Sequence, residues 1–216
     1  MIRFNHNVNN FIVWHLETQP IAYYKAMPIM ENHVELIIKG EANELIWLLE
    51  HFDIYTQGTS ATPSEILNTN HNIPIIDTLR GGKSTYHGLG QRVIYPMLKI
   101  HDKDIKKYMA NLQKWIVTAL QSLDVDAFII PDNIGVWVIE DQQEKKIAAI
   151  GVRVKKWVAY HGIAVNINSN LENFSNISPC GTSMGVTSLH KLKKTISFLE
   201  FDHQLKLAFY KVFNNE

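Results

Sequence analysis

The spacing of apolar residues predicts two helices in the first half of the chain. Between Tyr23 and Ile37, apolar side chains recur every three or four residues, as they do along one face of a helix. Pro28 lies early in this stretch, so the helix either begins there or bends there. A second helix is expected to end near residue 123. Asp102 is its expected N-cap, and its apolar face comprises Ile105, Met109, Leu112, Ile116 and Leu120.

Apolar runs predict strands elsewhere. Leu45–Leu49 is apolar throughout, which is typical of a buried strand. Three further runs cover residues 135–140, 146–154 and 157–167. The last two indicate a hairpin that turns through the two lysines between them.

The C-terminal part of the chain predicts one more helix. Ser197 and Glu200 have the spacing of a capping box, and they precede an amphipathic stretch through Leu205, Phe209 and Val212. Strands in the middle with helices before and after predict an α+β fold. Since the sequence contains no repeat, low-complexity tract or linker, we expect a single domain over residues 1–216.

Composition narrows the classes of function. Of 216 residues, 46% are hydrophobic, and 21 basic residues balance 21 acidic ones. No net charge draws this chain to nucleic acid or to an anionic membrane. No segment is apolar for long enough to span a bilayer, and the N-terminus lacks the apolar core of a secretory signal. A single cysteine cannot form an internal disulfide, so we expect a reducing, cytoplasmic location.

A glycine-rich segment, residues 80–91, is the first candidate for a binding site. Its glycines let backbone amides approach a ligand closely, and Arg80, Tyr86 and His87 add donors. It is not a phosphate-binding P-loop, because the first glycine of that motif would fall at Asp77. A dinucleotide-binding pattern is also weak, because Val93 occupies the position of its third glycine. The alternative is a glycine-rich structural turn.

Cys180 is the candidate nucleophile. It lies between Pro179 and Gly181, which favours an exposed turn. A free thiol has a pKa of about 8.5, so this role requires a nearby positive charge or base. The alternative is the common one for a lone cysteine, a small buried apolar side chain.

Lys146 is the candidate proton partner. If residues 146–154 form a strand, alternation places Lys146 on one face with Ala148, Ile150, Val152 and Val154. It is then the only charged residue on an apolar face, and burial favours the neutral amine that accepts a proton. The alternative is that Lys146 caps the strand end and reaches solvent.

His161 poses a similar choice. By alternation it shares a face with Trp157, Ile163 and Val165, as a hydrogen-bonded core histidine would. The functional interpretation is a polar group in a mostly apolar acyl pocket. The histidines and the single cysteine show no metal-binding spacing, so we expect no metal site.

Five blocks, in order and with their spacing, resemble the octanoyltransferases of the lipoyl pathway along most of the chain. These blocks are residues 49–51 with 55–58; 80–91 with 95–96; 135–138; 146–153 with 161–162 and 166; and 179–181 with 186–189. The resemblance implies a mixed sheet flanked by helices, as in the catalytic domain of biotin and lipoate protein ligases.

The resemblance also implies a reaction and a set of site residues. Cys180 would take octanoyl from octanoyl-acyl carrier protein as a thioester, and Lys146 would exchange protons with it. The acyl group would then pass to a lysine of a lipoyl domain, in 2-oxoacid dehydrogenase complexes or the glycine cleavage H protein. A thioester is already activated, so no cofactor is implied. The substrate-binding residues would be Arg80, Gly81, Gly82, Lys83, Ser84, Thr85, Tyr86, His87, Ala149, Ile150, Gly151, His161, Gly162 and Ile163.

The sequence departs from the family pattern mainly in the glycine-rich segment. Leu89 stands where the family usually has proline, and Lys83 and Ser84 replace commoner residues. Gln113 stands where glutamate is common. Three other functions remain open: an ATP-dependent lipoate or biotin ligase, a cysteine hydrolase that pairs Cys180 with a histidine, and a non-catalytic acyl-binding module.

Overall fold

A seven-stranded sheet with helices on both faces organises the chain. The structure is a computed structural model that describes residues 11–68, 72–178 and 185–213. The large sheet has the strand order β1-β2-β6-β10-β9-β8-β7 and is antiparallel except for the β1–β2 pair. Its strands are β1 (Val13–Leu16), β2 (Leu45–Leu49), β6 (Gln91–Lys99), β7 (Phe128–Ile130), β8 (Asn133–Glu140), β9 (Gln143–Lys155) and β10 (Val158–Asn166).

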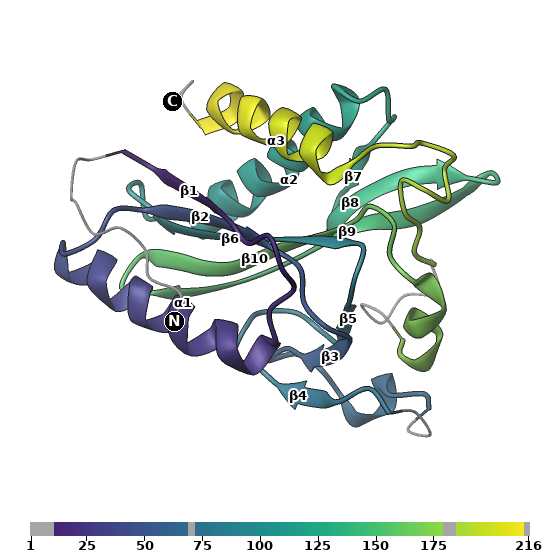
Figure 1. Cartoon of the computed structure of the whole chain (residues 1–216), viewed down its shortest axis with the longest axis horizontal. Coiled ribbons are helices and arrows are strands. Elements are labelled where there is room, and N and C mark those ends of the chain that lie inside the picture. Colours follow the sequence, from purple (N-terminus) through teal and green to yellow (C-terminus); the bar gives the residue numbers. More distant parts are fainter. Residues whose placement is uncertain (1–10, 69–71, 179–184, 214–216) are drawn as a thin grey trace.

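The two faces of this sheet belong to two cores. Along β2, Ile46 and Leu48 pack towards α2 (Ile105–Gln121) and α3 (Phe198–Phe213). Leu45, Trp47 and Leu49 pack on the other face, against α1 (Tyr23–Lys39). In Figure 1, α2 and α3 lie above the sheet and α1 below it. The predicted α+β class is confirmed, and β2 is apolar throughout because both of its faces are buried.

A small sheet lies on the α1 side of the large one. It has the order β4-β3-β5 and consists of β3 (Ile54–Gln57), β4 (Ile75–Asp77) and β5 (Thr85–His87), with a short 3₁₀ helix, η1 (Pro63–Glu65), between β3 and β4. A second 3₁₀ helix, η2 (Leu171–Asn176), follows β10. Figure 1 shows this sheet below the large one, beside the end of α1. Its position places the glycine-rich segment over the large sheet.

The predicted helices are present, with one correction at the start of α2. α1 begins at Tyr23, so Pro28 lies inside the helix and does not start it. The N-cap of α2 is Asp104, whose carboxylate accepts a hydrogen bond from the backbone N–H of Lys107 at 3.0 Å. The sequence prediction had chosen Asp102, which instead accepts a bond from the N–H of Asp104 at 3.2 Å and forms an ion pair with Lys107.

The β9–β10 hairpin is confirmed, but the turn is shifted by one residue. Lys156 and Trp157 both have positive φ, 46° and 64°, as a two-residue hairpin turn of the right twist requires. The apolar patterns missed β1 and, more importantly, β6. β6 joins β2 to β10 at the centre of the sheet, and Pro96 lies in its middle. None of the helices in the described residues is both long and apolar enough to cross a membrane.

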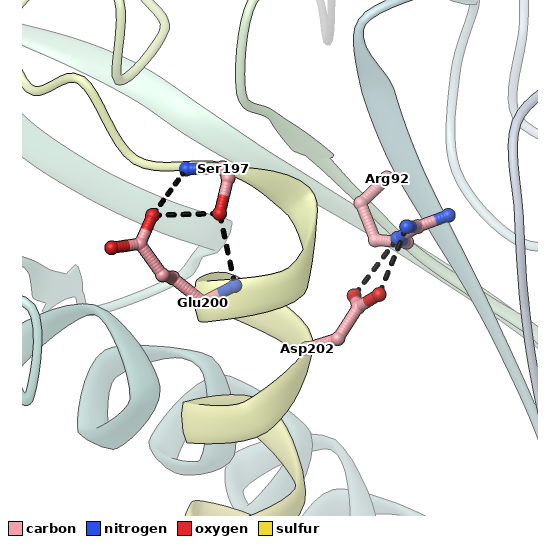
Figure 2. Close-up of polar contacts among 4 residues, drawn as sticks. All are labelled: Arg92, Ser197, Glu200 and Asp202. Atoms are coloured by element: carbon pink, nitrogen blue, oxygen red, sulfur yellow. Dashed lines mark hydrogen bonds and ion pairs between the residues drawn. The ribbon is translucent and has the colours of Figure 1, made fainter.

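A capping box at the N-terminus of α3 and an ion pair between α3 and the sheet are both shown in Figure 2. Glu200 accepts a hydrogen bond from the backbone N–H of Ser197 at 2.8 Å, and the Ser197 hydroxyl accepts one from the N–H of Glu200 at 3.2 Å. This confirms the predicted capping box. Arg92 on β6 donates two bonds, each 2.9 Å, to the carboxylate of Asp202 on α3. Burial raises the pKa of Asp202 even though Arg92 acts in the opposite direction.

Replacing Asp202 by alanine should therefore reduce the free energy of unfolding by more than an exposed ion pair contributes. The side chains of Arg92 and Asp202 are only 5% and 11% exposed, so Asp202→Ala leaves a buried cation without its carboxylate. We expect the free energy of unfolding to fall by about 3–5 kcal/mol. Urea denaturation measures this change. Asp102→Ala, which removes a half-exposed pair with Lys107, is the control and should leave the unfolding midpoint almost unchanged.

Candidate functional site

A cavity of about 480 Å³ lies between the large sheet and the glycine-rich segment. Its wall includes residues 80–85 and 87 from that segment, 149–151 from β9 and 161–163 from β10. Lys146 also lines it. The structure therefore brings together, around one space, nearly every substrate-binding residue predicted from the sequence. Such a concave, mostly apolar space with a few polar groups is the usual form of a small-molecule site.

Tyr86 is the exception among the predicted binding residues. It lies between Thr85 and His87 on β5, so its side chain points to the opposite face of that strand. Its hydroxyl donates to Asp53 at 2.8 Å and accepts from Asn173 Nδ2 at 2.8 Å. It packs on Phe174, away from the cavity. We conclude that Tyr86 supports the small sheet and makes no contact with the cavity.

The glycine-rich segment is held against the open edge of β9. β8 pairs with β9 only as far as Ala148. Beyond that point, the N–H of Gly81 donates to the carbonyl of Val152 at 2.9 Å. A Cβ at Gly151 would lie 2.7 Å from the Gly81 carbonyl oxygen, so only glycine permits this approach. The segment thus covers a strand edge and forms a cavity wall with the same contact.

Arg80 ties this segment to the small sheet. Its Nη2 donates to the carbonyl oxygen of Thr56 at 2.6 Å and to the Thr56 hydroxyl at 2.8 Å, and Nε donates to the same hydroxyl at 3.2 Å. Only 8% of the residue is exposed. A planar guanidinium with several fixed donors holds the loop in one orientation while its charge remains beside the cavity.

Lys146 is buried, as predicted, but not for the predicted reason. The β8–β9 register pairs Val136 with Ala148 and Trp137 with Lys146, so β9 contains one extra residue between these pairs. Neighbours along β8 face opposite sides, and Lys146 and Ala148 therefore do so too. The expectation that they share a face is wrong, because a β-bulge reverses the alternation. The bulge turns Lys146 away from the α2–α3 core.

The amine of Lys146 has a defined place. The residue is 5% exposed, and Nζ donates to the carbonyl of Ile134 at 3.0 Å. Nζ also lies 4.7 Å from the centre of the Trp137 ring. A Cβ at Gly135 would come within 2.9 Å of Lys146 Cε, so the missing side chain at Gly135 leaves room for the lysine. Gln113 fixes this glycine by donating to its carbonyl at 3.0 Å.

Two buried histidines, His87 and His161, line the cavity, and the ring of a third, His51, lies 5.9 Å from that of His87. Desolvation by burial lowers the pKa of His51 to about 4, and those of His87 and His161 to about 3. Arg80 lowers the latter two further. His51 is fixed between the carbonyl of Ile21 and the hydroxyl of Tyr95, each at 2.7 Å. All three rings are therefore neutral at pH 7 and serve as hydrogen-bonding groups.

His161 reaches the cavity through a local break in β10. The pairing with β6 is interrupted between Ala159 and Ile163, opposite Pro96, which has no N–H to donate. There His161 has a φ of +60°, which is rare for a residue other than glycine. Its ring lies 6.2 Å from that of Tyr95, on the face of the sheet towards α1. The prediction that His161 follows the alternation of Ile163 and Val165 is therefore wrong.

Cys180 and the neighbouring Pro179 and Gly181 lie outside the described residues. The chain on either side is anchored by backbone bonds. The N–H of Ser178 donates to the carbonyl of Glu65 at 2.7 Å, and the N–H of Lys146 donates to the carbonyl of Gly185 at 3.0 Å. The backbone of Gly185 is thus hydrogen-bonded directly to the backbone of Lys146, the candidate proton partner.

Several cavity residues were not predicted from the sequence. Tyr23, Tyr95, Met109 and Ile134 also line the cavity. Tyr95 follows the glycine-rich segment closely and could have been suspected from that position. The others had no signal, because an apolar or aromatic residue on a helix or strand looks the same whether it faces a core or a cavity.

Comparisons with known proteins agree with this geometry. The family model described as the lipoyl protein ligase A/B catalytic domain matches residues 22–210. A protein named octanoyltransferase from Rickettsia bellii (strain OSU 85-389) is 48% identical, over 90% of this chain and 95% of its own length. The octanoyltransferase of Anaplasma phagocytophilum (strain HZ) is 45% identical, over 94% of this chain and 99% of its own.

Solved structures share the fold at low sequence identity. The bipartite lipoate protein ligase of Thermoplasma acidophilum superposes with a TM-score of 0.72, at 17% identity, over 94% of this chain and 85% of that one. The biotin protein ligase of Aquifex aeolicus gives 0.50, at 12% identity, over 94% and 68%. The predicted mixed sheet flanked by helices, in the form found in these ligases, is confirmed.

The neutral histidines predict an acid-sensitive fold. Below a pH of about 6.5, each of these histidines becomes protonated in the unfolded state but stays neutral in the folded state. The free energy of unfolding should therefore fall as pH decreases from about 6.5 towards 4, by up to about 4 kcal/mol per pH unit for the three rings together. Urea denaturation across this range measures the slope.

His161→Gln tests one ring at a time. The variant should reduce the slope by about 1.4 kcal/mol per pH unit, because one proton fewer is taken up on unfolding. An unchanged slope would mean that His161 takes up its proton in the folded state as readily as in the unfolded one.

Proposed function

The chain belongs to the lipoyl protein ligase A/B catalytic domain family, and we propose that it moves octanoyl from octanoyl-acyl carrier protein to a lysine of a lipoyl domain through a thioester on Cys180. Octanoyl transfer in lipoate biosynthesis is its activity, since relatives named octanoyltransferase match at 41–48% identity over most of the chain. The chain is thus an acyltransferase. The observation that supports the proposed route best is the cavity, which joins Lys146 to the glycine-rich segment.

The first half-reaction loads the enzyme. The thiol of Cys180 gives its proton to the amine of Lys146, and the thiolate attacks the carbonyl carbon of the donor thioester. A new C–S bond forms to Cys180, and the bond to the sulfur of the carrier breaks. The carrier leaves as a thiolate and takes the proton from Lys146. No step consumes ATP, because the donor acyl group is already activated.

The second half-reaction delivers the acyl group. The amine of the acceptor lysine attacks the carbonyl carbon of the octanoyl-enzyme, a C–N bond forms, and the bond to Cys180 breaks. Sulfur retains the electron pair as a thiolate, and the nitrogen loses one proton to Lys146. Acid–base help of this kind is worth roughly 10²- to 10⁴-fold in rate.

The position of Lys146 suits this exchange. Its backbone is bonded to Gly185, five residues after Cys180, and its amine makes one bond to a carbonyl and lies against Trp137. In the neutral amine, a lone pair remains to accept the proton of the thiol. Apolar side chains of the cavity, including those of Ile150, Val152 and Ile163, suit an octanoyl chain.

The remaining parts of the proposal concern partners and context. We assign the donor role to octanoyl-acyl carrier protein, and the acceptor role to lipoyl domains of 2-oxoacid dehydrogenase complexes and the glycine cleavage H protein. We place the reaction in the cytoplasm and assign it to one catalytic domain over residues 1–216. Arg80, His87, His161 and the other predicted cavity residues bind the acyl substrate, and no cofactor takes part.

An ATP-dependent ligase is the second candidate. Lipoate-protein ligase A bound with ATP shares the fold with a TM-score of 0.71, over 94% of this chain and 86% of that one. Its identity to this chain is 16%, so the likeness concerns the fold alone. A ligase would activate a free acid and would have no need of Cys180.

The mass of the intact protein separates the two routes. Wild type and Cys180→Ser are mixed with octanoyl-acyl carrier protein without ATP. We expect an octanoyl adduct on wild type alone, and we expect added lipoyl domain to discharge it. Cys180→Ala should abolish transfer and leave the far-UV circular dichroism spectrum unchanged.

Three other results would contradict the proposal. Acylation of the lipoyl domain that appears only with ATP and free octanoate would favour the ligase. Release of free octanoate without acylation of the lipoyl domain would favour a hydrolase. Turnover by Cys180→Ala at the wild-type rate would exclude the thioester.

Lys146 is tested through the reactivity of Cys180. In Lys146→Ala, we expect the pH at which iodoacetamide alkylates Cys180 rapidly to shift upward, and transfer to slow by roughly 10²-fold or more. Gly135→Ala should also slow transfer, because the added methyl group would lie 2.9 Å from both the lysine Cε and the Ala148 carbonyl oxygen, at a positive φ that alanine rarely adopts. Gly40→Asn, at another positive φ with open space around it, is the control and should transfer at the wild-type rate. An alkylation profile unchanged in Lys146→Ala would contradict this role.

A further inference from the structure

A buried chain of hydrogen bonds begins at His87, on the wall of the cavity. His87 is 7% exposed, and its Nδ1 lies 2.7 Å from Oε1 of Gln91. The rings of His51 and Tyr23 pack nearby, with centroids 5.9 and 6.3 Å away, and Arg80 and His161 act on it through charge. These groups lie around His87, and Gln91 is hydrogen-bonded to its ring.

The amide of Gln91 can face His87 in only one orientation. Its Nε2 donates to the carbonyl of Tyr86 at 3.2 Å and to Oδ1 of Asn166 at 2.9 Å. Both N–H bonds of the amide are then used, so the atom that faces His87 must be the oxygen, which only accepts. Nδ1 of His87 must therefore carry the hydrogen. In a neutral ring, this leaves a lone pair on Nε2.

Asn166 continues the chain towards Lys146. Its Nδ2 donates to the carbonyl of Thr187 at 2.9 Å, and the N–H of Thr187 donates to the carbonyl of Lys146 at 3.0 Å. Gln91 and Asn166 are 1% and 4% exposed, so these bonds are protected from competition with solvent. The same network thus fixes a histidine of the cavity wall and the backbone of the proposed proton partner.

We propose that Gln91 and Asn166 are positioning residues that hold His87 as the Nδ1–H tautomer, so that Nε2 accepts a hydrogen bond from the amine of the acceptor lysine. The inference rests on the proposed function. An octanoyl thioester carries no N–H or O–H at its reacting carbon, whereas the attacking amine carries both a lone pair and hydrogens. Within the described part of the chain, Nε2 of His87 has no hydrogen-bond partner.

The bond to His87 orients the amine and transfers no proton. One N–H points to Nε2, so the nitrogen lone pair is directed to the carbonyl carbon. The C–N bond forms, the C–S bond breaks, and the proton lost by nitrogen goes to Lys146 as described above. His87 begins and ends neutral. The effect of its tautomer is confined to the second half-reaction, because the first involves no amine acceptor.

The tautomer can be measured without any substrate. In protein labelled with ¹⁵N-histidine, the ring shifts of His87, assigned by their loss in His87→Gln, show which nitrogen carries the hydrogen. We expect a protonated Nδ1 and an unprotonated Nε2. A hydrogen on Nε2 in wild type overturns the proposal, whether or not the enzyme transfers octanoyl.

A variant of Gln91 tests the consequence for transfer. Gln91→Leu removes the acceptor and should give a mixture of tautomers. We expect the reaction of preformed octanoyl-enzyme with lipoyl domain to slow by up to about 100-fold, as a misplaced reactant does. Loading of Cys180 by octanoyl-acyl carrier protein should continue at the wild-type rate. Equal loss in both half-reactions, or loss in neither, contradicts the assignment.

A control variant separates positioning from stability. Gln121→Leu makes the same substitution on α2, where Gln121 donates to the carbonyl of Ala127, and should transfer normally. Failure of wild type to form the octanoyl adduct would refute the proposed function, whereas the tautomer result stands independently.

Discussion

The open edge of β9 is the constraint on which the site depends. β8 stops pairing at Ala148, and the backbone beyond it would expose unpaired groups if nothing covered them. The glycine-rich segment covers this edge through the hydrogen bond from Gly81 to Val152. The glycines at 81 and 151 permit the two backbones to approach this closely. The cavity is the space that this loop and the sheet enclose. A loop required for backbone pairing thus also places Arg80 beside the substrate space.

Apolar periodicity predicted the elements that have one clear pattern. Leu45–Leu49, the helices and the β9–β10 hairpin were all visible because burial on one or both faces fixes residue type. β6 was missed because it begins with Gln91 and Arg92, whose polar side chains are buried through bonds to distant residues. A sequence does not reveal such partners, since Asp202 lies 110 positions away.

The candidate site was predicted better by resemblance than by alternation. Alternation along β9 and β10 gave the wrong face for Lys146 relative to Ala148 and for His161 relative to Ile163. In both cases a local irregularity, a bulge or a positive φ, turns the side chain into the cavity. Regular periodicity fails where a strand is bent to present a side chain, and functional sites are common among such places. Cys180 stays a prediction from the sequence.

Pro96 interrupts the pairing of β6 with β10 at one place in the large sheet. β6 is among the most buried strands, yet at Pro96 it offers no hydrogen to its neighbour. β10 does not pair with β6 from Tyr160 to Gly162, although it stays paired with β9 there. Within the β6–β10 pair, the fewest backbone hydrogen bonds therefore have to break in the middle of the ladder rather than at its ends. This place adjoins the cavity. Along this pair of strands, the place where the backbones can move apart most easily is thus the place beside the cavity.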